Sequence, residues 1–338
     1  MTVASMVPVE SSLGYACPRC HGALTSTPAA YACNVCQSVF PVIMGIPDFR
    51  LLPDPWIGMV DDRDKAQRLV ERTHGASLEA MVRAYWAMTP GTPRALASRF
   101  VDHVMGAERR SREWLSAIGS SARVEGAWLD VGTGTGDLAV VVAEQGIRTI
   151  GIDIAMRWLV VAKRRAELAG VPVSFVCCNA EHLPFASASF ARVVSVGTIE
   201  HCIDATRALH EARRVLVAGG DACVRTVNRY TIMPEPHVGV WGVGYVPRRL
   251  ADRYVQWRSG QRYEHHRPLS SGELRSGLRS AGFRDVRVDA APMLPSEQAR
   301  LRSLGWASAG YNRARNTPIA RSALRMIAPL LEASGVAA

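Results

Sequence analysis

Glycines at every second position follow a short apolar stretch that ends in an acid. The run is Trp128-Leu129-Asp130-Val131-Gly132-Thr133-Gly134-Thr135-Gly136-Asp137. This pattern is typical of a buried strand that turns abruptly into a helix, with Gly132, Gly134 and Gly136 letting the backbone close against a ligand. A dinucleotide loop, G-x-G-x-x-G, holds a pyrophosphate and has its third glycine where this chain has Asp137. Two carboxylates, Asp130 and Asp137, would repel a diphosphate, so the loop predicts a ligand that carries positive charge.

Polar residues follow the next predicted strands as well. The stretch 148–153 ends in Asp153, about 20 residues beyond the glycine loop, where an acid at a strand end binds ribose hydroxyls. The stretch 173–178 runs into Asn179 and Ala180, and the strand that begins near 190 runs into Glu200 and His201. These positions predict a nucleoside-type ligand held by the ends of adjoining strands.

The order of these signals resembles the class I S-adenosylmethionine (SAM) methyltransferases, and within them the ubiquinone and menaquinone methyltransferase-like group. The resemblance covers about 126–229. It rests on the G-x-G-x-G loop after an acid, on the Glu200-His201 turn, and on the segment 211–220, which matches the pattern RVL-x-x-GG. The chain departs from the family at Asn179, where Asp is more usual, and at 191–193, where Ala-Arg-Val replaces D-x-V.

The resemblance implies an α/β fold with a doubly wound, Rossmann-like sheet and SAM as the cofactor. It implies a cofactor site whose members come from successive strand ends, with Asp153 on the ribose, Asn179 and Ala180 beside the adenine, and Glu200 near the SAM amine. The remaining cofactor-binding residues are those of the loop: Asp130, Gly132, Gly134 and Gly136.

Four cysteines near the start of the chain form two C-x-x-C pairs, Cys17 with Cys20 and Cys33 with Cys36, separated by residues 21–32. Four thiolates at this spacing are the tetrahedral set that a structural Zn²⁺ prefers, and such a closed site leaves no position for a substrate. A pair of disulfides is the alternative, but it needs an oxidising compartment. The passage 40–49 resembles the tail of small zinc-ribbon domains, which occur free as activators of methyltransferases or fused in front of them.

Methyl transfer to a hydroxyl or carbon needs only a group that accepts the acceptor's proton. His201 is the first candidate for this catalytic base, because a neutral imidazole suits the role near pH 7, and His237 is the second. A capping or loop hydrogen bond is the structural alternative for His201. Glu200 could also join His201 around a divalent metal, although one Glu-His pair is too little to establish such a site.

Aromatic side chains outside the sheet are candidates for the acceptor pocket. The insertion between Asn228 and Pro268 is rich in Pro, Gly, Trp, Tyr and His, and loops of this kind shape substrate cavities. We expect Asn228, Trp241 and Tyr245 to contact the acceptor. Tyr85, on a predicted helix in front of the glycine loop, could line the same pocket or belong to ordinary helix core.

The elements that must position these residues divide the chain into four predicted parts. They are a zinc ribbon over 14–52, helical lid segments over 60–120, a SAM-binding domain over 121–295 with an insertion at 229–268, and a helical tail over 296–338. The spacing of apolar residues predicts helices over 61–88, broken near 74–75, and over 94–118, and a mildly amphipathic helix over 317–334.

Composition and charge limit the classes of protein to which the chain could belong. The chain has 338 residues, 48% of them hydrophobic, and no apolar run of the roughly 18 residues that span a bilayer. No basic region followed by an apolar one stands at the N-terminus, so we expect a cytoplasmic, reduced protein. The net charge of +10 allows an RNA partner, but Lys65 and Lys163 are the only lysines and the arginines are dispersed among acids. The oligomeric state is open.

These observations predict a SAM-dependent methyltransferase that acts at oxygen or carbon of a small organic acceptor, of a quinone-like, lipid or secondary-metabolite kind. Two alternatives stay open. One is a zinc-ribbon methyltransferase of ribosomal RNA bases, and the other is a SAM-binding partner protein that does not turn over.

Overall fold

The computed structural model describes residues 14–89, 92–119, 124–300 and 305–338. The chain divides into two compact units, Met1–Val193 with Val215–Val217, and Val194–Arg214 with Ala218–Ala338. The N-terminal residues that underlie the expected location, and the predicted boundary at 120–121, lie outside the described residues. Among the described residues, no helix is both long and apolar enough to cross a bilayer.

The large sheet has seven strands in the order β10-β11-β9-β8-β5-β6-β7. In the first unit β5, β6 and β7 pair in parallel, and their nearly continuous apolar runs are buried as parallel strands require. In the second unit β11 pairs antiparallel with both β9 and β10. This mixed sheet with its helices confirms the predicted α/β fold. The strands are β5 (Trp128–Val131), β6 (Thr149–Asp153), β7 (Val173–Cys177), β8 (Phe190–Val196), β9 (Leu216–Val227), β10 (Phe283–Ala290) and β11 (Leu330–Ala337).

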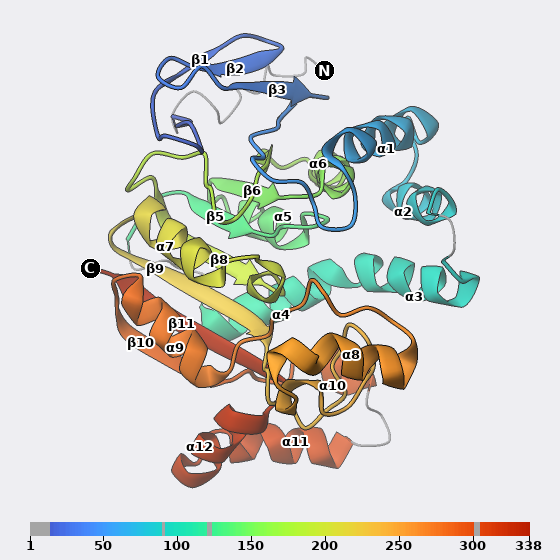
Figure 1. Cartoon of the computed structure of the whole chain (residues 1–338), viewed down its shortest axis with the longest axis vertical. Coiled ribbons are helices and arrows are strands. Elements are labelled where there is room, and N and C mark those ends of the chain that lie inside the picture. Colours follow the sequence, from blue (N-terminus) through green and yellow to red (C-terminus); the bar gives the residue numbers. More distant parts are fainter. Residues whose placement is uncertain (1–13, 90–91, 120–123, 301–304) are drawn as a thin grey trace. The chain divides into compact units, whose positions relative to one another are not determined.

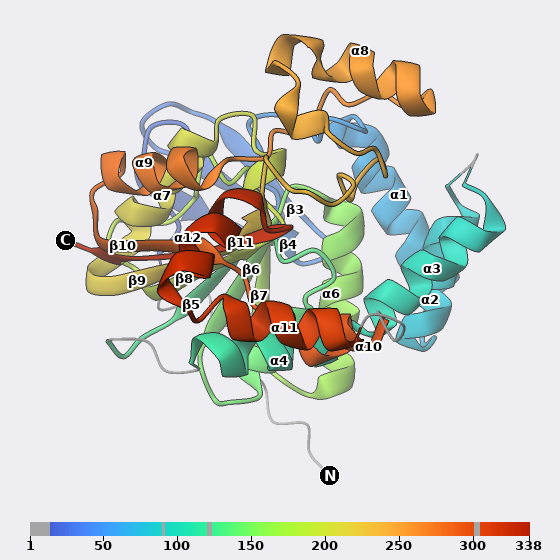
Figure 2. The same ribbon diagram turned by 90° about the horizontal axis from the view of Figure 1, so that it is seen from below.

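Helices of the first unit pack beside the parallel strands, and α1 and α2 both contact α6 (Figures 1 and 2). The predicted helices over 61–88 are confirmed, with the break at 74–75, whereas the segment 94–118 forms two helices that meet at Gly106. The helices are α1 (Met59–Arg72), α2 (Leu78–Ala87), α3 (Arg94–Met105), α4 (Ala107–Ile118), α5 (Asp137–Ala143) and α6 (Met156–Ala169).

The N-terminal part of the first unit is a small sheet in the order β1-β2-β3-β4 (Figure 1). Its strands are β1 (Leu24–Ser26), β2 (Ala30–Cys33), β3 (Val39–Ile43) and β4 (Ile46–Pro47). Phe49 is fully buried between the rings of Tyr15, Tyr31 and Phe40, with ring centroids 5.1–5.2 Å apart. Tyr15 also contacts Phe185 of the large-sheet region, so this small sheet has an aromatic core in addition to its cysteines.

In the second unit the insertion has a small apolar core of its own, in which α8 packs on the loop before it. Ser270 and Glu273 form a capping box at the start of the helix Ser271–Ser280. The helices of this unit are α7 (Ala205–Val215), α8 (Arg248–Ser259), α9 (Ser271–Ser280), α10 (Pro295–Arg300), α11 (Gly305–Ala314) and α12 (Pro318–Ile327), with short 3-10 turns at η2 (Ile199–His201) and η3 (Val243–Tyr245).

The predicted helical tail is wrong beyond residue 327. The helix expected over 317–334 ends at Ile327, and β11 follows it and pairs on both sides. Every second residue of β11 is buried, but the buried positions are Leu331, Ala333, Gly335 and Ala337. Alanine, glycine and serine differ little in hydrophobicity, so the sequence of β11 shows no clear two-residue hydrophobic period. Its Leu-Glu-Ala residues also favour a helix over a strand.

Candidate functional site

The glycine loop joins β5 to α5 in the first unit. Gly132, Gly134 and Gly136 have φ values of +76°, +52° and +77°, a backbone region that residues with a Cβ rarely adopt. A Cβ on Gly136 would lie 2.7 Å from the Cβ of Ala162 on α6. The loop therefore turns sharply from β5 into α5, as the sequence predicted, and it also lies close against α6.

Asp130, at the end of β5, is buried beneath this loop. Its carboxylate accepts a 2.6 Å hydrogen bond from the Thr133 hydroxyl. Burial raises the pKa of the Asp130 carboxyl to about 7, and the nearby charges of Asp137 and Asp153 add to the rise. A cation bound at the loop would stabilise the ionised form, which fits the positive ligand expected from the sequence.

Asp153, at the end of β6, is hydrogen-bonded to the backbone of the glycine loop. Its two carboxylate oxygens accept hydrogen bonds from the backbone N–H groups of Gly134 (2.9 Å) and Ala155 (2.8 Å). Burial raises the pKa of this carboxyl above its usual value, although both amides favour its charged form. Asp153 thus links the glycine loop to the start of α6, at the position predicted to bind ribose.

Asn179, at the end of β7, contacts a segment that lies far away in the sequence. Its side-chain oxygen accepts from the N–H groups of Leu51 (2.9 Å) and Leu52 (3.1 Å), and its amide donates to the carbonyl of Leu52 (3.2 Å). An Asp carboxylate here could accept the first two bonds but could not donate the third, so the amide of Asn179 makes a contact that an Asp would lack. Asn179 therefore positions the segment 51–52 beside the predicted adenine position, next to Ala180.

A buried network of charged residues anchors the same segment. Arg50 donates to Asp48 (2.6 Å) and Asp62 (2.7 Å), and Arg157 donates to Asp62 (2.7 Å) and Asp54 (2.8 Å). Asp62 also accepts from the N–H of Met156, the first residue of α6 (2.8 Å). Residues 48–54 are thus fixed to α1 and α6.

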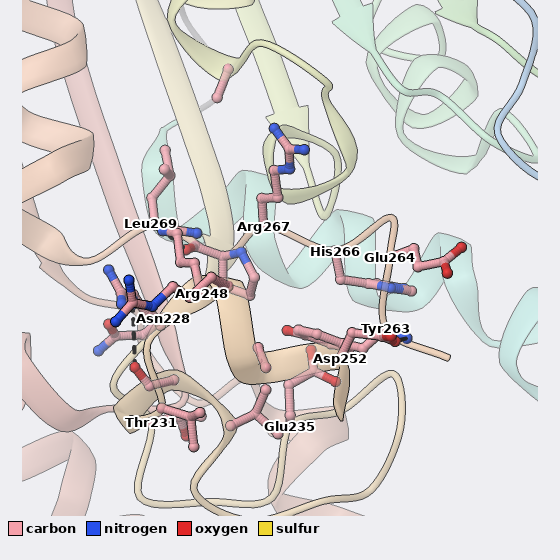
Figure 3. Close-up of a pocket in the computed structure, with 18 of the residues that line it drawn as sticks. Asn228, Thr231, Glu235, Arg248, Asp252, Tyr263, Glu264, His266, Arg267 and Leu269 are labelled. Atoms are coloured by element: carbon pink, nitrogen blue, oxygen red, sulfur yellow. Dashed lines mark hydrogen bonds between the residues drawn. The ribbon is translucent and has the colours of Figure 1, made fainter. Parts of the chain in front are cut away.

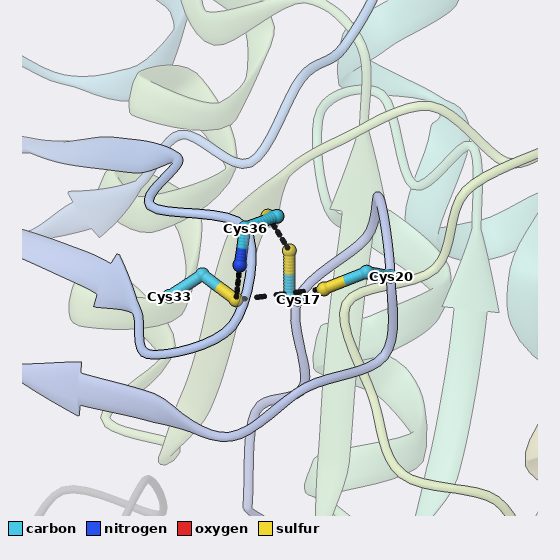
Figure 4. A group of neighbouring side chains, drawn as sticks. All are labelled: Cys17, Cys20, Cys33 and Cys36. Atoms are coloured by element: carbon cyan, nitrogen blue, oxygen red, sulfur yellow. Dashed lines mark hydrogen bonds between the residues drawn. The ribbon is translucent and has the colours of Figure 1, made fainter.

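The four cysteines converge in the small sheet (Figure 4). The Sγ atoms of Cys17 and Cys36 lie 3.6 Å apart, those of Cys20 and Cys33 lie 3.5 Å apart, and all four lie within 4.8 Å of one another. The backbone N–H groups of residues 35 and 36 donate to the sulfur of Cys33. Four converging sulfurs with backbone groups among their hydrogen-bond partners fit a tetrahedral metal site.

Tyr85 belongs to the helix core of the first unit. Its side chain is 5% exposed and packs on Trp158 of α6, with ring centroids 4.0 Å apart. The ammonium of Lys65 lies 4.0 Å from the ring centroid on another side. These contacts favour the alternative that the sequence left open, in which Tyr85 stabilises the packing of α2 on α6.

A cavity of about 540 Å³ lies within the second unit (Figure 3). Among the labelled residues, Asn228 and Thr231 lie on one side of it and Asp252, Tyr263 and His266 on another. The wall is mixed: apolar members include Met233, Val243, Val246, Ala251 and Leu269, and charged members include Asp204, Glu235, Asp252, Glu264, Arg229, Arg248, Arg249 and Arg267.

Of the residues predicted to contact the acceptor, Asn228 lines this cavity and Trp241 and Tyr245 do not. Asn228 is fully buried, and its amide donates to the carbonyls of Met326 (3.0 Å) and Ala328 (2.9 Å). Trp241 and Tyr245 are 59% and 50% exposed, and both donate their polar hydrogen to nearby backbone carbonyls. The intervening residues 242–244 are the ones that form the wall.

His201 and His237, the two candidate bases, lie together with a third histidine that the sequence did not single out. Ring centroids are 4.8 Å apart for His201 and His237, 5.1 Å for His201 and His266, and 4.3 Å for His237 and His266. Glu235 accepts a 2.5 Å hydrogen bond from Nδ1 of His237. The only sequence signal for His266 was its place in the aromatic insertion, in the run Tyr263-Glu264-His265-His266.

The protonation of this cluster follows from its surroundings. Burial lowers the pKa of His201, and burial with the neighbouring imidazoles lowers that of His266 to about 4. Burial alone would raise the pKa of Glu235, but the hydrogen bond and charge of His237 hold it below its ordinary value. The rings of His201 and His266 are therefore neutral at pH 7, and each keeps a nitrogen lone pair that could bind a metal.

Glu200, predicted to lie near the SAM amine, is buried with its carboxylate toward β9. It accepts from the Thr226 hydroxyl (2.8 Å) and from the backbone N–H of Val227 (3.4 Å). Its backbone carbonyl accepts from the N–H of Arg267. The Glu200 side chain thus joins the turn at η2 to β9, while the adjacent His201 points into the histidine cluster.

Comparison with known proteins places the site in context. A family described as "Methyltransferase domain" matches residues 129–224. The chain is 36% identical over 119 residues to the demethylmenaquinone methyltransferase of Thermus thermophilus, covering 35% of this chain and 51% of that protein. It is 31% identical over 190 residues to the ubiquinone/menaquinone biosynthesis C-methyltransferase of Desulfotalea psychrophila, covering 54% and 75%.

Solved structures were also compared with the chain, and the similarities are at lower sequence identity. A SAM-dependent methyltransferase from Mesorhizobium loti has a TM-score of 0.48 and 18% identity, and the match covers 66% of this chain and 97% of that one. Coverage of the curated relatives is partial, since the chain spans about half the length of the Thermus protein and 63% of the ubiquinone biosynthesis O-methyltransferase of Idiomarina loihiensis.

Proposed function

Because the chain belongs to the SAM-dependent methyltransferases, we propose that it transfers the methyl group of SAM to oxygen or carbon of a small, quinone-like organic acceptor. The observation that carries the proposal is the match over 129–224, the stretch that contains the glycine loop and the strand ends described above. Relatives named for demethylmenaquinone and ubiquinone biosynthesis support an aromatic, hydroxylated acceptor.

The cofactor is assigned to the first unit. Asp130 and the loop glycines would hold the positively charged part of SAM, and Asp153 would accept hydrogen bonds from the ribose hydroxyls. Methyl transfer neutralises the sulfonium, so a water-poor site strengthens the field on the transferring group, and an in-line acceptor needs little further ordering. Ala180 remains the proposed neighbour of the adenine, with Asn179 positioning the segment 51–52 at its side.

The acceptor is assigned to the cavity of the insertion 229–268. A volume of about 540 Å³ lies in the usual range for small-molecule sites, and its mixed wall suits a ring that carries hydroxyl groups. The histidine cluster includes the predicted catalytic residues His201 and His237. At this wall it would act as the base that accepts the proton of the acceptor.

We also propose that the four cysteines hold a structural Zn²⁺. Cys17, Cys20, Cys33 and Cys36 would bind it as thiolates. With four protein ligands the site would be closed, so these cysteines would tie the loops of the small sheet together through the metal and would leave no position for a reaction. The ribbon would then hold residues 48–54 in place, so that Arg50 pairs with Asp62 and the backbone of 51–52 bonds to Asn179.

The test incubates the purified, zinc-loaded protein with methyl-labelled SAM and two acceptor sets, reduced hydroxyquinones and unmodified ribosomal RNA. Label in the organic extract is expected. Label in RNA instead would replace the small-molecule proposal with the RNA alternative. Release of S-adenosylhomocysteine with no label in either acceptor would also contradict the small-molecule proposal. A cavity-filling change, Leu269→Trp, should raise KM for the quinol without changing SAM affinity. Leu250→Trp, on an exposed position outside the cavity wall, is the control.

A further inference from the structure

Three histidines from three separate segments of the second unit meet at the edge of the cavity. His201 ends the turn η2, His237 lies in the loop before η3, and His266 lies on the cavity wall. One nitrogen from each ring can be chosen so that the three nitrogens lie within 4.8 Å of one another. Apart from the four cysteines, this is the one group of potential metal ligands found in the part of the chain that the structure describes.

The geometry points to a metal site: we propose that His201, His237 and His266 bind a divalent transition-metal cation, such as Zn²⁺ or Co²⁺, with an open position toward the cavity. Imidazole nitrogens suit such cations. At metal–nitrogen distances of about 2.0–2.1 Å, tetrahedral ligands lie about 3.4 Å apart. The rings therefore need to close by at most about 1.4 Å, which rotation of their side chains can supply.

Hydrogen bonds around the cluster resemble those that orient metal-binding histidines. The Glu235 carboxylate accepts from Nδ1 of His237, and the backbone N–H groups of His237 and Val238 donate to the same carboxylate. A proton fixed on Nδ1 leaves the lone pair on Nε2 for a metal, in the carboxylate–histidine–metal arrangement. The ring of His201 is likewise hydrogen-bonded to the backbone of His265.

Glu200 is not a member of this site. Its carboxylate is directed to Thr226 and Val227, so the pair Glu200-His201 seen in the sequence does not form a joint ligand set. The site instead needs two histidines from the insertion. With three protein ligands, one position stays open, as in catalytic rather than structural metal sites.

The consequence for chemistry rests on the proposed function. An acceptor hydroxyl bound at the open position would lose its proton more easily, because a divalent cation stabilises the oxyanion. The imidazoles would then act as ligands, and the hydroxyl proton would pass to solvent, so that no free histidine base would be needed.

The test counts metal ions on the full chain whose cysteine site is loaded with Zn²⁺. After dialysis against Co²⁺, the wild type should carry two metal ions per chain, with cobalt ligand-field bands and no thiolate-to-cobalt charge-transfer band. His237→Ala and His266→Ala should each carry one. His210→Ala, an exposed histidine of α7 outside the cluster, should keep two.

Glu235→Gln keeps all three ligands and removes the charge that orients His237, so Co²⁺ affinity should fall by about 10- to 100-fold. A wild type that carries one metal ion overturns the inference, and so do histidine variants that retain two. SAM binding by calorimetry on the same samples separates the two proposals. Normal SAM binding without the second ion refutes only the metal site, whereas failure to bind SAM refutes the proposed function.

Discussion

Asp62 offers the sharpest test of how the ribbon and the cofactor site are held together. Its side chain is fully buried and accepts three short hydrogen bonds, from Arg50 (2.7 Å), Arg157 (2.7 Å) and the N–H of Met156 (2.8 Å). Asp62→Ala leaves both guanidinium groups buried with only one carboxylate partner each. Removing one member of a buried charged network costs about 3–5 kcal/mol.

A loss of that size is a large fraction of the roughly 5–15 kcal/mol that stabilises a typical domain. The assay is urea unfolding of the zinc-loaded protein, followed by tryptophan fluorescence and circular dichroism. Asp61→Ala is the matched control, because Asp61 precedes Asp62 in α1 and is exposed. Its change should cost less than about 1 kcal/mol.

Equal stability of the two variants would refute the reasoning, since it would mean that the network contributes no more than an exposed ion pair. A second readout is SAM affinity. Because Asp62 also holds the first amide of α6, Asp62→Ala should weaken SAM binding, while Asp61→Ala should not.

Three further predictions concern the loop and the ribbon. The pKa of Asp130 is about 7, above its unfolded value of about 3.9, so this group makes folding less favourable as pH rises from about 4 to 7. SAM binding should therefore release a proton and tighten from pH 6 to 8, as calorimetry in two buffers would show, and Asp130→Asn should abolish the effect. Gly136→Ala should cost about 2–5 kcal/mol of stability, from positive φ and the 2.7 Å contact with Ala162, whereas Gly146→Ala, at the same φ in open space, should cost about 1–2 kcal/mol. Zinc chelation or Cys33→Ser should unfold the small sheet and free Phe49, seen as lost near-UV dichroism, while far-UV dichroism falls little.

The strand-to-helix turns around the glycine loop could be predicted from the sequence because their signals are local. Alternating glycines, an acid at the end of β5 and another at the end of β6 each report a strand-to-helix turn within a few residues. The structure confirms those turns and adds that Asp153 bonds the loop itself. The same reasoning found the four cysteines, since the C-x-x-C spacing alone encodes their convergence.

The cavity of the second unit and the histidine cluster were harder to predict from the sequence, because they depend on contacts between distant segments. Trp241 and Tyr245 were chosen for their size, yet their polar groups bond neighbouring carbonyls and their rings stay exposed. His266 gave no local signal and joins His201 and His237 only through folding. The partners of Asn179 lie more than 120 residues away, which no motif reports.

The placement of β11 has a consequence for how the second unit is made. β9 and β10 have no direct ladder with each other, and both pair with β11, the described strand that leaves the ribosome last. Until β11 has been synthesised, β9 and β10 each have an edge whose backbone N–H and C=O groups lack their final partner. A chaperone or a second nascent chain could pair with these edges. Deleting residues 330–337 would make that exposure permanent, so such a truncation should aggregate rather than yield a smaller soluble enzyme.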